Sequence, residues 1–317
     1  MGNRIVTLVV IVSAALQLMG ERLDAAVQNA SDASLNEHTI YVTGDPAHPA
    51  LLQVTMFYPD GASPFPLAII NHSKALGDPK NEPPYRSIFL SRYFLSRGYA
   101  VALPMMRGFA GSGGVFRVNK CDLAGFGLTE AADIAAVVKY MSGQVHIDGS
   151  RAIVVGVGLG GWNTLALGVR GCPGVKGLIT FSAGIREPAC ATWEENLIAA
   201  SGDYGARSRL LTLWFCGEDD DVVTAPTQRL MYQRYTEAGG KAEFVSYGSF
   251  KWADHNIIGS QEGYPIWMPK VDAFLTELGL PGRELESRYL PAELPPATNF
   301  ARIDDVNAIP NATDKTK

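Results

Sequence analysis

The chain has 317 residues, of which 47% are hydrophobic and 19% charged, with 27 basic against 32 acidic side chains. This apolar content and the modest net charge of −5 exclude disorder over most of the length. A sequence pI near 5.6 without a basic cluster also argues against a nucleic-acid partner. We therefore expect one compact domain of the size of an enzyme.

The N-terminal segment differs in character from the rest. Arg4 precedes an uncharged stretch, residues 5–20, that is dominated by Val, Leu, Ile and Ala. This stretch is shorter than the roughly 20 residues that a membrane span needs. We expect residues 1–26, ending at Ala26, to be a signal peptide and the protein to be secreted or periplasmic. An uncleaved N-terminal membrane anchor is the alternative.

Four cysteines would then lie in an oxidising compartment, where disulfides are permitted. Cys172 and Cys190 flank one predicted strand and are candidates for a disulfide. Free buried thiols are the alternative, and this interpretation suits Cys216, which lies inside an apolar run.

Strand and helix patterns alternate along the mature chain. Strands are predicted at residues 38–42, 51–58, 65–71, 99–106, 151–157, 175–181, 210–216 and 242–247, the first two as an antiparallel pair. Helices are predicted at residues 85–96, 123–141, 162–169, 227–238 and 268–278. Nearly continuous apolar strands that alternate with helices indicate an α/β fold, a mostly parallel sheet with helices on both faces.

Two segments fall outside this alternation. Residues 184–208, which include Trp193, are long enough for a small cap over the sheet. After the expected domain, residues 27–280, the chain becomes rich in Pro, Ala and charge. We predict an extended C-terminal tail, residues 281–317, in which only residues 300–303 pack.

Ligands of such sheets bind at the carboxyl ends of the strands. The turn Asn71-His72-Ser73-Lys74 follows the third strand and can direct a backbone N–H into a pocket as half of an oxyanion hole. A plain surface loop is the alternative. The glycine-rich run 111–114 has no G-x-G-x-x-G pattern leading into a helix, which argues against a dinucleotide or phosphate site.

The end of the strand at residues 151–157 says most about the functional site. It runs into Gly156-Val157-Gly158-Leu159-Gly160 and then a helix, which has the form of the nucleophile elbow G-x-S-x-G. The residue at the nucleophile position is Gly158, which has no side chain to attack a substrate. A natural substitution and one introduced by sequencing or by design would both give this pattern.

Two later strand exits carry an acid and a histidine. Residues 218–221 are four consecutive acids, and His255 follows the last predicted strand. Most acids in such a run are solvated, and a single loop histidine is more often without function. The order elbow, acid, histidine nevertheless matches the chain order of one hydrolase fold, so the three weak signals support one another.

Together these residues resemble the α/β-hydrolase superfamily, in its dienelactone-hydrolase and prolyl-oligopeptidase-like branch. The resemblance spans residues 51–280 and rests on Asn71-His72, residues 104–108, the elbow at residues 156–161, residues 217–220 and Asp254-His255. Its members are esterases, lactonases or peptidases with a Ser or Cys nucleophile, from which Gly158 departs.

The resemblance also implies the roles of the remaining site residues. Asp220 is implied as the triad acid and His255 as the general base. The oxyanion donors would be the backbone N–H of Leu159 and that of Ser73 or Lys74, although the family usually has glycine at the position of Ser73.

Three functions remain open. The first is a secreted hydrolase-family protein whose turnover is weak, water-mediated or lost, acting on a small ester or peptide-like ligand. The others are a pseudohydrolase that only binds a small ligand, and a cofactor-free lyase or oxygenase that uses the His and Asp. Ser73, Ser112 and Cys121 are alternative nucleophiles, but none lies on the predicted elbow.

No metal, cofactor or nucleic-acid partner is expected. The five histidines have no metal-ligand spacing, and no two cysteines are spaced as C-x-x-C. Contact with a membrane is expected only through an N-terminal anchor, if the leader is not cleaved.

Overall fold

A computed structural model describes residues 35–250 and 257–294, and the described residues from His38 onward form one compact unit. The predicted signal peptide, His255 and residues 300–303 lie outside the described residues. No helix within the described ranges is long and apolar enough to cross a lipid bilayer.

The centre of the fold is an eight-stranded sheet with the order β1-β2-β4-β3-β5-β6-β7-β8. The pairs from β4 through β3, β5, β6 and β7 to β8 are parallel, and β2 pairs with β4 in the antiparallel sense. This confirms the predicted mostly parallel sheet. The strands are β1 (Glu37–Thr43), β2 (Leu51–Phe57), β3 (Phe65–Asn71), β4 (Ala100–Pro104), β5 (Ile147–Val157), β6 (Val175–Phe181), β7 (Leu211–Cys216) and β8 (Ala242–Ser246).

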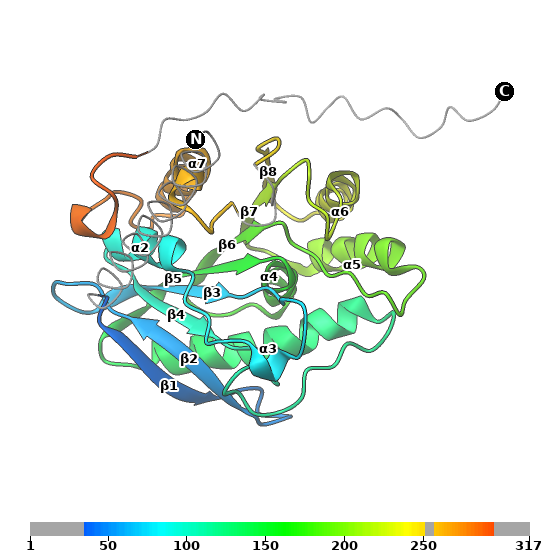
Figure 1. Cartoon of the computed structure of the whole chain (residues 1–317), viewed down its shortest axis with the longest axis horizontal. Helices are drawn as coiled ribbons and strands as arrows, with labels where there is room; N and C mark the ends of the chain where they lie inside the picture. Colours follow the sequence, from blue (N-terminus) through cyan, green and yellow to red (C-terminus); the bar gives the residue numbers. More distant parts are fainter. Residues whose placement is uncertain (1–34, 251–256, 295–317) are drawn as a thin grey trace, which may run out of the picture. The chain divides into compact units, whose positions relative to one another are not determined.

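Helices lie on both faces of the sheet, as predicted (Figure 1). The group of α3, α4, α5 and α6 packs together on one side, and α2 and α7 meet on the other, where the rings of Tyr93 and Trp267 are 4.8 Å apart. The helices are α2 (Ile88–Ser96), α3 (Leu123–Ser142), α4 (Leu159–Arg170), α5 (Trp193–Arg207), α6 (Ala225–Glu237) and α7 (Tyr264–Glu277). Short 3₁₀ turns are η1 (Pro79–Asn81), η3 (Gln261–Gly263) and η4 (Ser287–Tyr289).

Coverage on both sides explains why the central strands are apolar along their whole length. Val154 is fully buried in the cluster formed with α3 and α4, whereas Phe181 lies on the other face, 6.0 Å from the ring of Trp267. The parallel register pairs Asn71 with Gly156 and Val157 with Phe181. The exits of β3, β5 and β6 are therefore neighbours at one edge of the sheet.

The segment predicted as a small cap belongs to the helical layer instead. Residues 193–207 form α5, whose Leu197 and Tyr204 are fully buried. Tyr204 packs on Trp162 of α4 with ring centroids 4.7 Å apart, and its hydroxyl donates to the carbonyl of Ala124 at 2.7 Å. Because of this apolar packing, the segment lies against the hydrophobic core.

The disulfide joins Cys121 to Cys190, so the expected Cys172–Cys190 pair is wrong. Cys172 precedes β6 and Cys190 follows it, which puts the length of a strand between them. Cys121 lies just before α3 and Cys190 just before α5, and these two helices pack side by side. Cys216 is a buried thiol, as the apolar run around it indicated.

The first part of the C-terminal tail also differs from the prediction. Within residues 281–294, the Leu285 N–H donates to the carbonyl of Ser96 at the end of α2 at 2.7 Å. Tyr289 is buried and its hydroxyl accepts from the N–H of Asp60 at 3.1 Å. Packing is thus not confined to residues 300–303, because this tail supplies apolar and hydrogen-bonding groups that cover α2.

Candidate functional site

The predicted elbow is a sharp turn between β5 and α4. Gly158 has φ 51° and ψ −116°, a conformation that glycine adopts without the strain that a Cβ brings. Its N–H donates to the carbonyl of Phe181 at 2.9 Å, and its own carbonyl accepts from the N–H groups of Trp162 and Gly184, both at 3.0 Å. The turn is therefore held by β6, by α4 and by the loop after β6.

The flanking glycines are required by close approach of the backbone. A Cβ on Gly156 would stand 2.2 Å from the carbonyl oxygen of Gly160, and one on Gly160 would stand 2.3 Å from that of Asn71. Both glycines of the predicted motif thus allow α4 to pack directly on β5 and on the exit of β3. The structure builds the strand–turn–helix of an elbow with Gly158 at its apex.

The residues predicted as oxyanion donors lie beside this apex. Leu159 is the first residue of α4, where backbone N–H groups have no partner within the helix. Ser73 and Lys74 follow β3, and β3 is the direct neighbour of β5. The parallel register of Asn71 with Gly156 extends toward Ser73 and Gly158, so the β3 turn lies next to the elbow.

His72 is the buried residue of this turn, with 2% of its surface exposed. The backbone N–H of Met106 donates to its Nε2 at 2.9 Å, which leaves the proton on Nδ1, and Nδ1–H donates to the carbonyl of Ser73 at 2.6 Å. Burial lowers the pKa of His72 to about 4, while the bond to Ser73 opposes this shift. The imidazole is therefore neutral at physiological pH.

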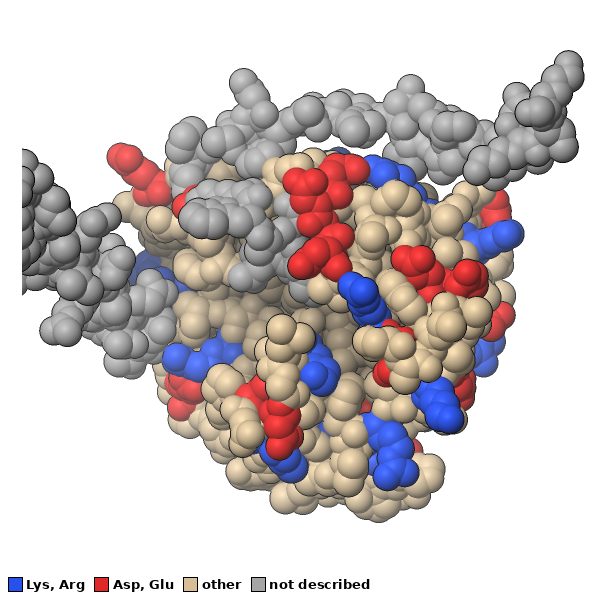
Figure 2. All heavy atoms as spheres, turned by 45° about the vertical axis from the view of Figure 1, so that its right-hand side comes forward, with Lys and Arg blue, Asp and Glu red and all other residues tan. Residues whose placement is uncertain are grey.

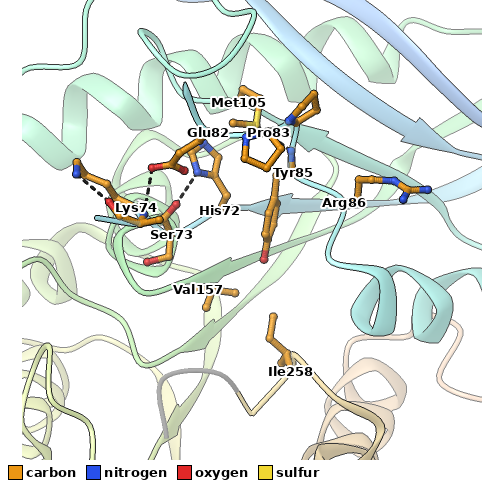
Figure 3. A pocket seen from close by; sticks show the side chains of 12 residues that line it. His72, Ser73, Lys74, Glu82, Pro83, Tyr85, Arg86, Met105, Val157 and Ile258 are labelled. Atoms are coloured by element: carbon orange, nitrogen blue, oxygen red, sulfur yellow. Dashed lines mark hydrogen bonds between the residues drawn. The ribbon is translucent and has the colours of Figure 1, made fainter. Parts of the chain in front are cut away.

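A pocket of about 490 Å³ opens in front of these turns. Figure 3 shows the Tyr85 side chain running into it, with the hydroxyl directed toward Val157 and Ile258. Burial raises the pKa of Tyr85 to about 12, so the phenol stays a hydrogen-bond donor at neutral pH. The lining residues are His72, Ser73, Lys74, Ala75, Glu82, Pro83, Pro84, Tyr85, Arg86, Met105, Val157 and Ile258.

Two of the three charged residues that line this pocket, Glu82 and Lys74, bind the backbone of one of its walls (Figure 3). Glu82 Oε1 accepts from the N–H of Ala75 at 3.1 Å, and Lys74 Nζ donates to the carbonyls of Ala75 and Gly77 at 2.9 and 3.3 Å. The remaining lining is largely apolar. This composition suits a small ligand with an apolar body and few polar groups.

Asp220 is the buried acid of the run after β7. It is 4% exposed, whereas Asp219 and Asp221 are exposed, and Glu218 is occupied by Ser246 and Arg229. Asp220 Oδ1 accepts from two backbone N–H groups, those of residues 222 and 223, at 2.9 and 3.2 Å, and Oδ2 accepts from the side-chain amide of residue 228 at 3.1 Å. The carboxylate is thus fixed within its loop.

His255 lies outside the described residues, so its role as the general base stays a prediction. The described chain resumes at Ile257, and Ile258 lines the pocket. The described residues that follow His255 in the chain therefore begin at the wall of this pocket.

The alternative nucleophiles are reduced to one by the structure. Cys121 is bonded to Cys190, and the hydroxyl of Ser112 is fully buried, where it accepts from the N–H of Gln53 and donates to the carbonyl of Met105. Ser73 is half-buried and lines the pocket.

Tyr85 was missed by the sequence analysis, which assigned it to a helix. The helix begins only at Ile88, and Tyr85 belongs to the segment before it. The Pro83-Pro84 pair before it restricts Glu82 and Pro83 to extended backbone but is compatible with a helix that starts at Tyr85, so no local signal would have found it.

Charge on one face of the molecule is mixed. On the face seen in Figure 2, Lys and Arg side chains alternate with Asp and Glu around a hollow in the surface. Such a face has no extended field of one sign and gives little long-range attraction to a strongly charged ligand.

Comparison with known proteins agrees with this geometry. A family model described as X-Pro dipeptidyl-peptidase (S15 family) matches residues 47–237, which is more than half of the chain. No curated protein matches the chain in sequence.

Solved structures show the same architecture. Dipeptidyl peptidase 4 of Porphyromonas gingivalis is 19% identical with a TM-score of 0.57, over 76% of this chain but only 35% of the peptidase. An esterase of Pyrococcus furiosus is 16% identical with a TM-score of 0.55, over 78% of this chain and 92% of the esterase. A Klebsiella pneumoniae protein described as a dienelactone hydrolase is 16% identical with a TM-score of 0.52, over 77% and 98%. These likenesses confirm the predicted α/β-hydrolase fold.

Proposed function

The chain belongs to the X-Pro dipeptidyl-peptidase (S15) family, and on that basis we propose that it binds a small ester or peptide-like carbonyl compound at the elbow. Gly158 takes the place of the nucleophile, so hydrolysis is lost or proceeds slowly through an activated water.

The backbone at Gly158 is the observation that carries this proposal. Its φ of 51° and ψ of −116° at the junction of β5 and α4 are those of a residue held at the apex of an elbow, with three backbone hydrogen bonds fixing it. A side chain at this apex would cost of order 1–3 kcal/mol in backbone strain, which functional residues tolerate and glycine avoids. This conformation supports our proposal that the scaffold for a nucleophile is kept without the nucleophile.

In the water-mediated reaction, His255 takes a proton from water as the oxygen bonds to the carbonyl carbon of the substrate. The N–H group of Leu159 and that of Ser73 or Lys74 hold the resulting oxyanion. Collapse of the intermediate breaks the bond to the leaving alcohol or amine, which receives the proton from His255. Asp220 orients the imidazole and stabilises its charge. Such a site retains about 10³–10⁴-fold acceleration over water from the oxyanion hole and binding.

The pocket supports a small, largely uncharged ligand. Its volume of about 490 Å³ is within the range of small-molecule sites, and Met105, Val157 and Ile258 give it apolar surface. Tyr85 adds one hydroxyl donor that is directed into the pocket.

We also propose that the protein is exported through its N-terminal segment. The Cys121–Cys190 disulfide supports this, because disulfides persist in oxidising compartments. An anchored form would meet the same redox conditions.

The test is hydrolysis of short-chain p-nitrophenyl esters by the wild type, Gly158→Ser and Gly158→Ser/His255→Ala. We expect little turnover by the wild type, a gain of at least 100-fold for Gly158→Ser, and loss of this gain in the double variant. Gly158→Ala is the matched control, because it introduces the same backbone strain without a hydroxyl. Rapid wild-type turnover that Gly158→Ser does not increase would overturn the proposal.

A further inference from the structure

We propose that His72 is a positioning residue of the oxyanion hole: its ring turns the Ser73–Lys74 peptide so that the N–H of Lys74 faces the elbow. This inference rests on the proposed function for its catalytic meaning. It also selects Lys74 over Ser73 as the second oxyanion donor, a choice that the sequence left open.

The first step of the argument is the place of the imidazole. Its Nε2 accepts from the N–H of Met106, which follows β4. The strand order is β4-β3-β5, so the ring is anchored on the β4 side of β3. The ring is also fixed by Phe109, whose centroid is 4.8 Å away in an edge arrangement.

The second step is the direction of the peptide group. Nδ1–H of His72 donates to the carbonyl of Ser73 at 2.6 Å (Figure 3). This carbonyl therefore points at the ring, which is anchored on the β4 side of β3. In a planar trans peptide the C=O and the following N–H point in opposite directions. The N–H of Lys74 is therefore directed toward β5, where Gly158 and Leu159 lie.

The third step is that both hydrogen bonds of the His72 ring persist at physiological pH. The ring is buried and its pKa is lowered to about 4, so Nε2 keeps the lone pair that accepts from Met106 and the proton stays on Nδ1. A rotated Ser73–Lys74 peptide would present its carbonyl to the oxyanion instead of its N–H, which repels negative charge.

Two substitutions separate the two hydrogen bonds of the ring. The amide nitrogen of Asn overlies Nδ1, so His72→Asn keeps a donor for the Ser73 carbonyl and loses the bond to Met106. The longer side chain in His72→Gln reaches the position of Nε2, accepts from Met106 and leaves the Ser73 carbonyl without its donor. Thermal unfolding of both variants shows whether each is folded.

The activity arm uses these variants in the Gly158→Ser chain with p-nitrophenyl esters. Removing one oxyanion donor typically lowers kcat by 10²–10³-fold. We expect a loss of this size for His72→Gln with an unchanged KM, and less than about a tenfold loss for His72→Asn. Equal losses in the two variants, or the larger loss in His72→Asn, would overturn the assignment.

The second experiment observes the Ser73–Lys74 peptide directly in the protein that keeps Gly158, and it does not depend on catalytic activity. We expect ¹⁵N NMR of His72 to show protonated Nδ1, and His72→Gln to shift the Lys74 amide resonance and speed its exchange far more than His72→Asn does. A Lys74 amide that is insensitive to His72→Gln would overturn the inference. If Gly158→Ser is inactive while the NMR result holds, the proposed function fails and the positioning of the peptide stands.

Discussion

Gly184 donates its backbone N–H to the carbonyl oxygen of Gly158 at 3.0 Å, which ties the loop after β6 to the elbow. Gly184 itself packs so closely on Val223 that a Cβ would stand 2.7 Å from Cγ2 of that residue. The N–H of Val223 in turn donates to the carboxylate of Asp220 at 3.2 Å. The predicted triad acid is thus connected to the elbow through a short series of direct contacts.

Asp220→Asn tests whether this carboxylate serves the site. In the Gly158→Ser chain we expect kcat to fall on the order of 10³–10⁴-fold, because the general base loses the group that orients it and stabilises its charge. The pKa of His255, followed by NMR, should fall in the same variant, since a neighbouring negative charge is removed.

Asp219→Asn is the matched control, because Asp219 is the exposed neighbour in the same turn. It should leave ester hydrolysis by the Gly158→Ser chain within about twofold of its parent. If the pKa of His255 is the same with Asn and with Asp at position 220, the triad assignment is wrong.

A side chain at the apex of the elbow should lower stability. Gly158 has φ 51°, so Gly158→Ser and Gly158→Ala should each reduce the free energy of unfolding by about 1–3 kcal/mol. Urea unfolding measures this, and the two variants should agree because the strain is in the backbone. Variants as stable as the wild type would show that the apex is not strained.

The disulfide should contribute strongly to stability. It closes a loop between residues 69 apart in the sequence, for which chain entropy predicts a contribution of about 4 kcal/mol. Cys190→Ser should therefore lower the midpoint of urea unfolding to about the value that the wild type shows after reduction. Cys172→Ser, at a cysteine outside the disulfide, should change little, and a further fall when Cys190→Ser is reduced would contradict the observed pairing.

Glu130 of α3 should make stability fall as the pH rises. It is 2% exposed, and burial together with the nearby Asp133 raises its pKa to about 8, although Arg107 opposes the shift. The folded state thus holds a proton that the unfolded state, with a pKa near 4.5, has released. Its stabilising contribution is complete below pH 4.5 and is lost as the pH rises toward about 8.

Glutamine is an uncharged isostere of glutamate. The free energy of unfolding of Glu130→Gln should therefore rise relative to that of the wild type by up to about 1.4 kcal/mol per pH unit between pH 4.5 and about 8. Urea unfolding at pH 5, 6, 7 and 8 measures the difference, with the surface substitution Glu237→Gln as the control. A difference between wild type and Glu130→Gln that does not vary with pH would contradict a protonated Glu130.

Some elements follow from local sequence alone. The bounds of β3 and β6 agree with the predicted residues 65–71 and 175–181, because each is an apolar run closed by polar or small residues. The helix α5 could not be predicted from local sequence, because its apolar residues alternate with glycine and acids. It is stabilised by the contact of Tyr204 with Trp162.

The same distinction applies to the site. The glycines of the elbow could be predicted, because close approach of the backbone at this strand exit requires glycine. The roles of Asp220 and His255 stay predictions. The role of His72 could not be predicted from the sequence, since it depends on a hydrogen bond to Met106, which follows a neighbouring strand. The disulfide partner of Cys190 likewise depends on which helix ends meet in space.

The most direct test of an elbow that lacks only its nucleophile is covalent labelling with an alkyl fluorophosphonate. An activated serine oxygen bonds to phosphorus as fluoride leaves, and the general base receives the hydroxyl proton. Mass spectrometry of the folded Gly158→Ser chain should find one label, on the serine introduced at position 158, and none when His255→Ala is added. The wild type should stay unlabelled. A wild-type chain labelled at Ser73, or a folded Gly158→Ser chain that takes no label, would contradict the account.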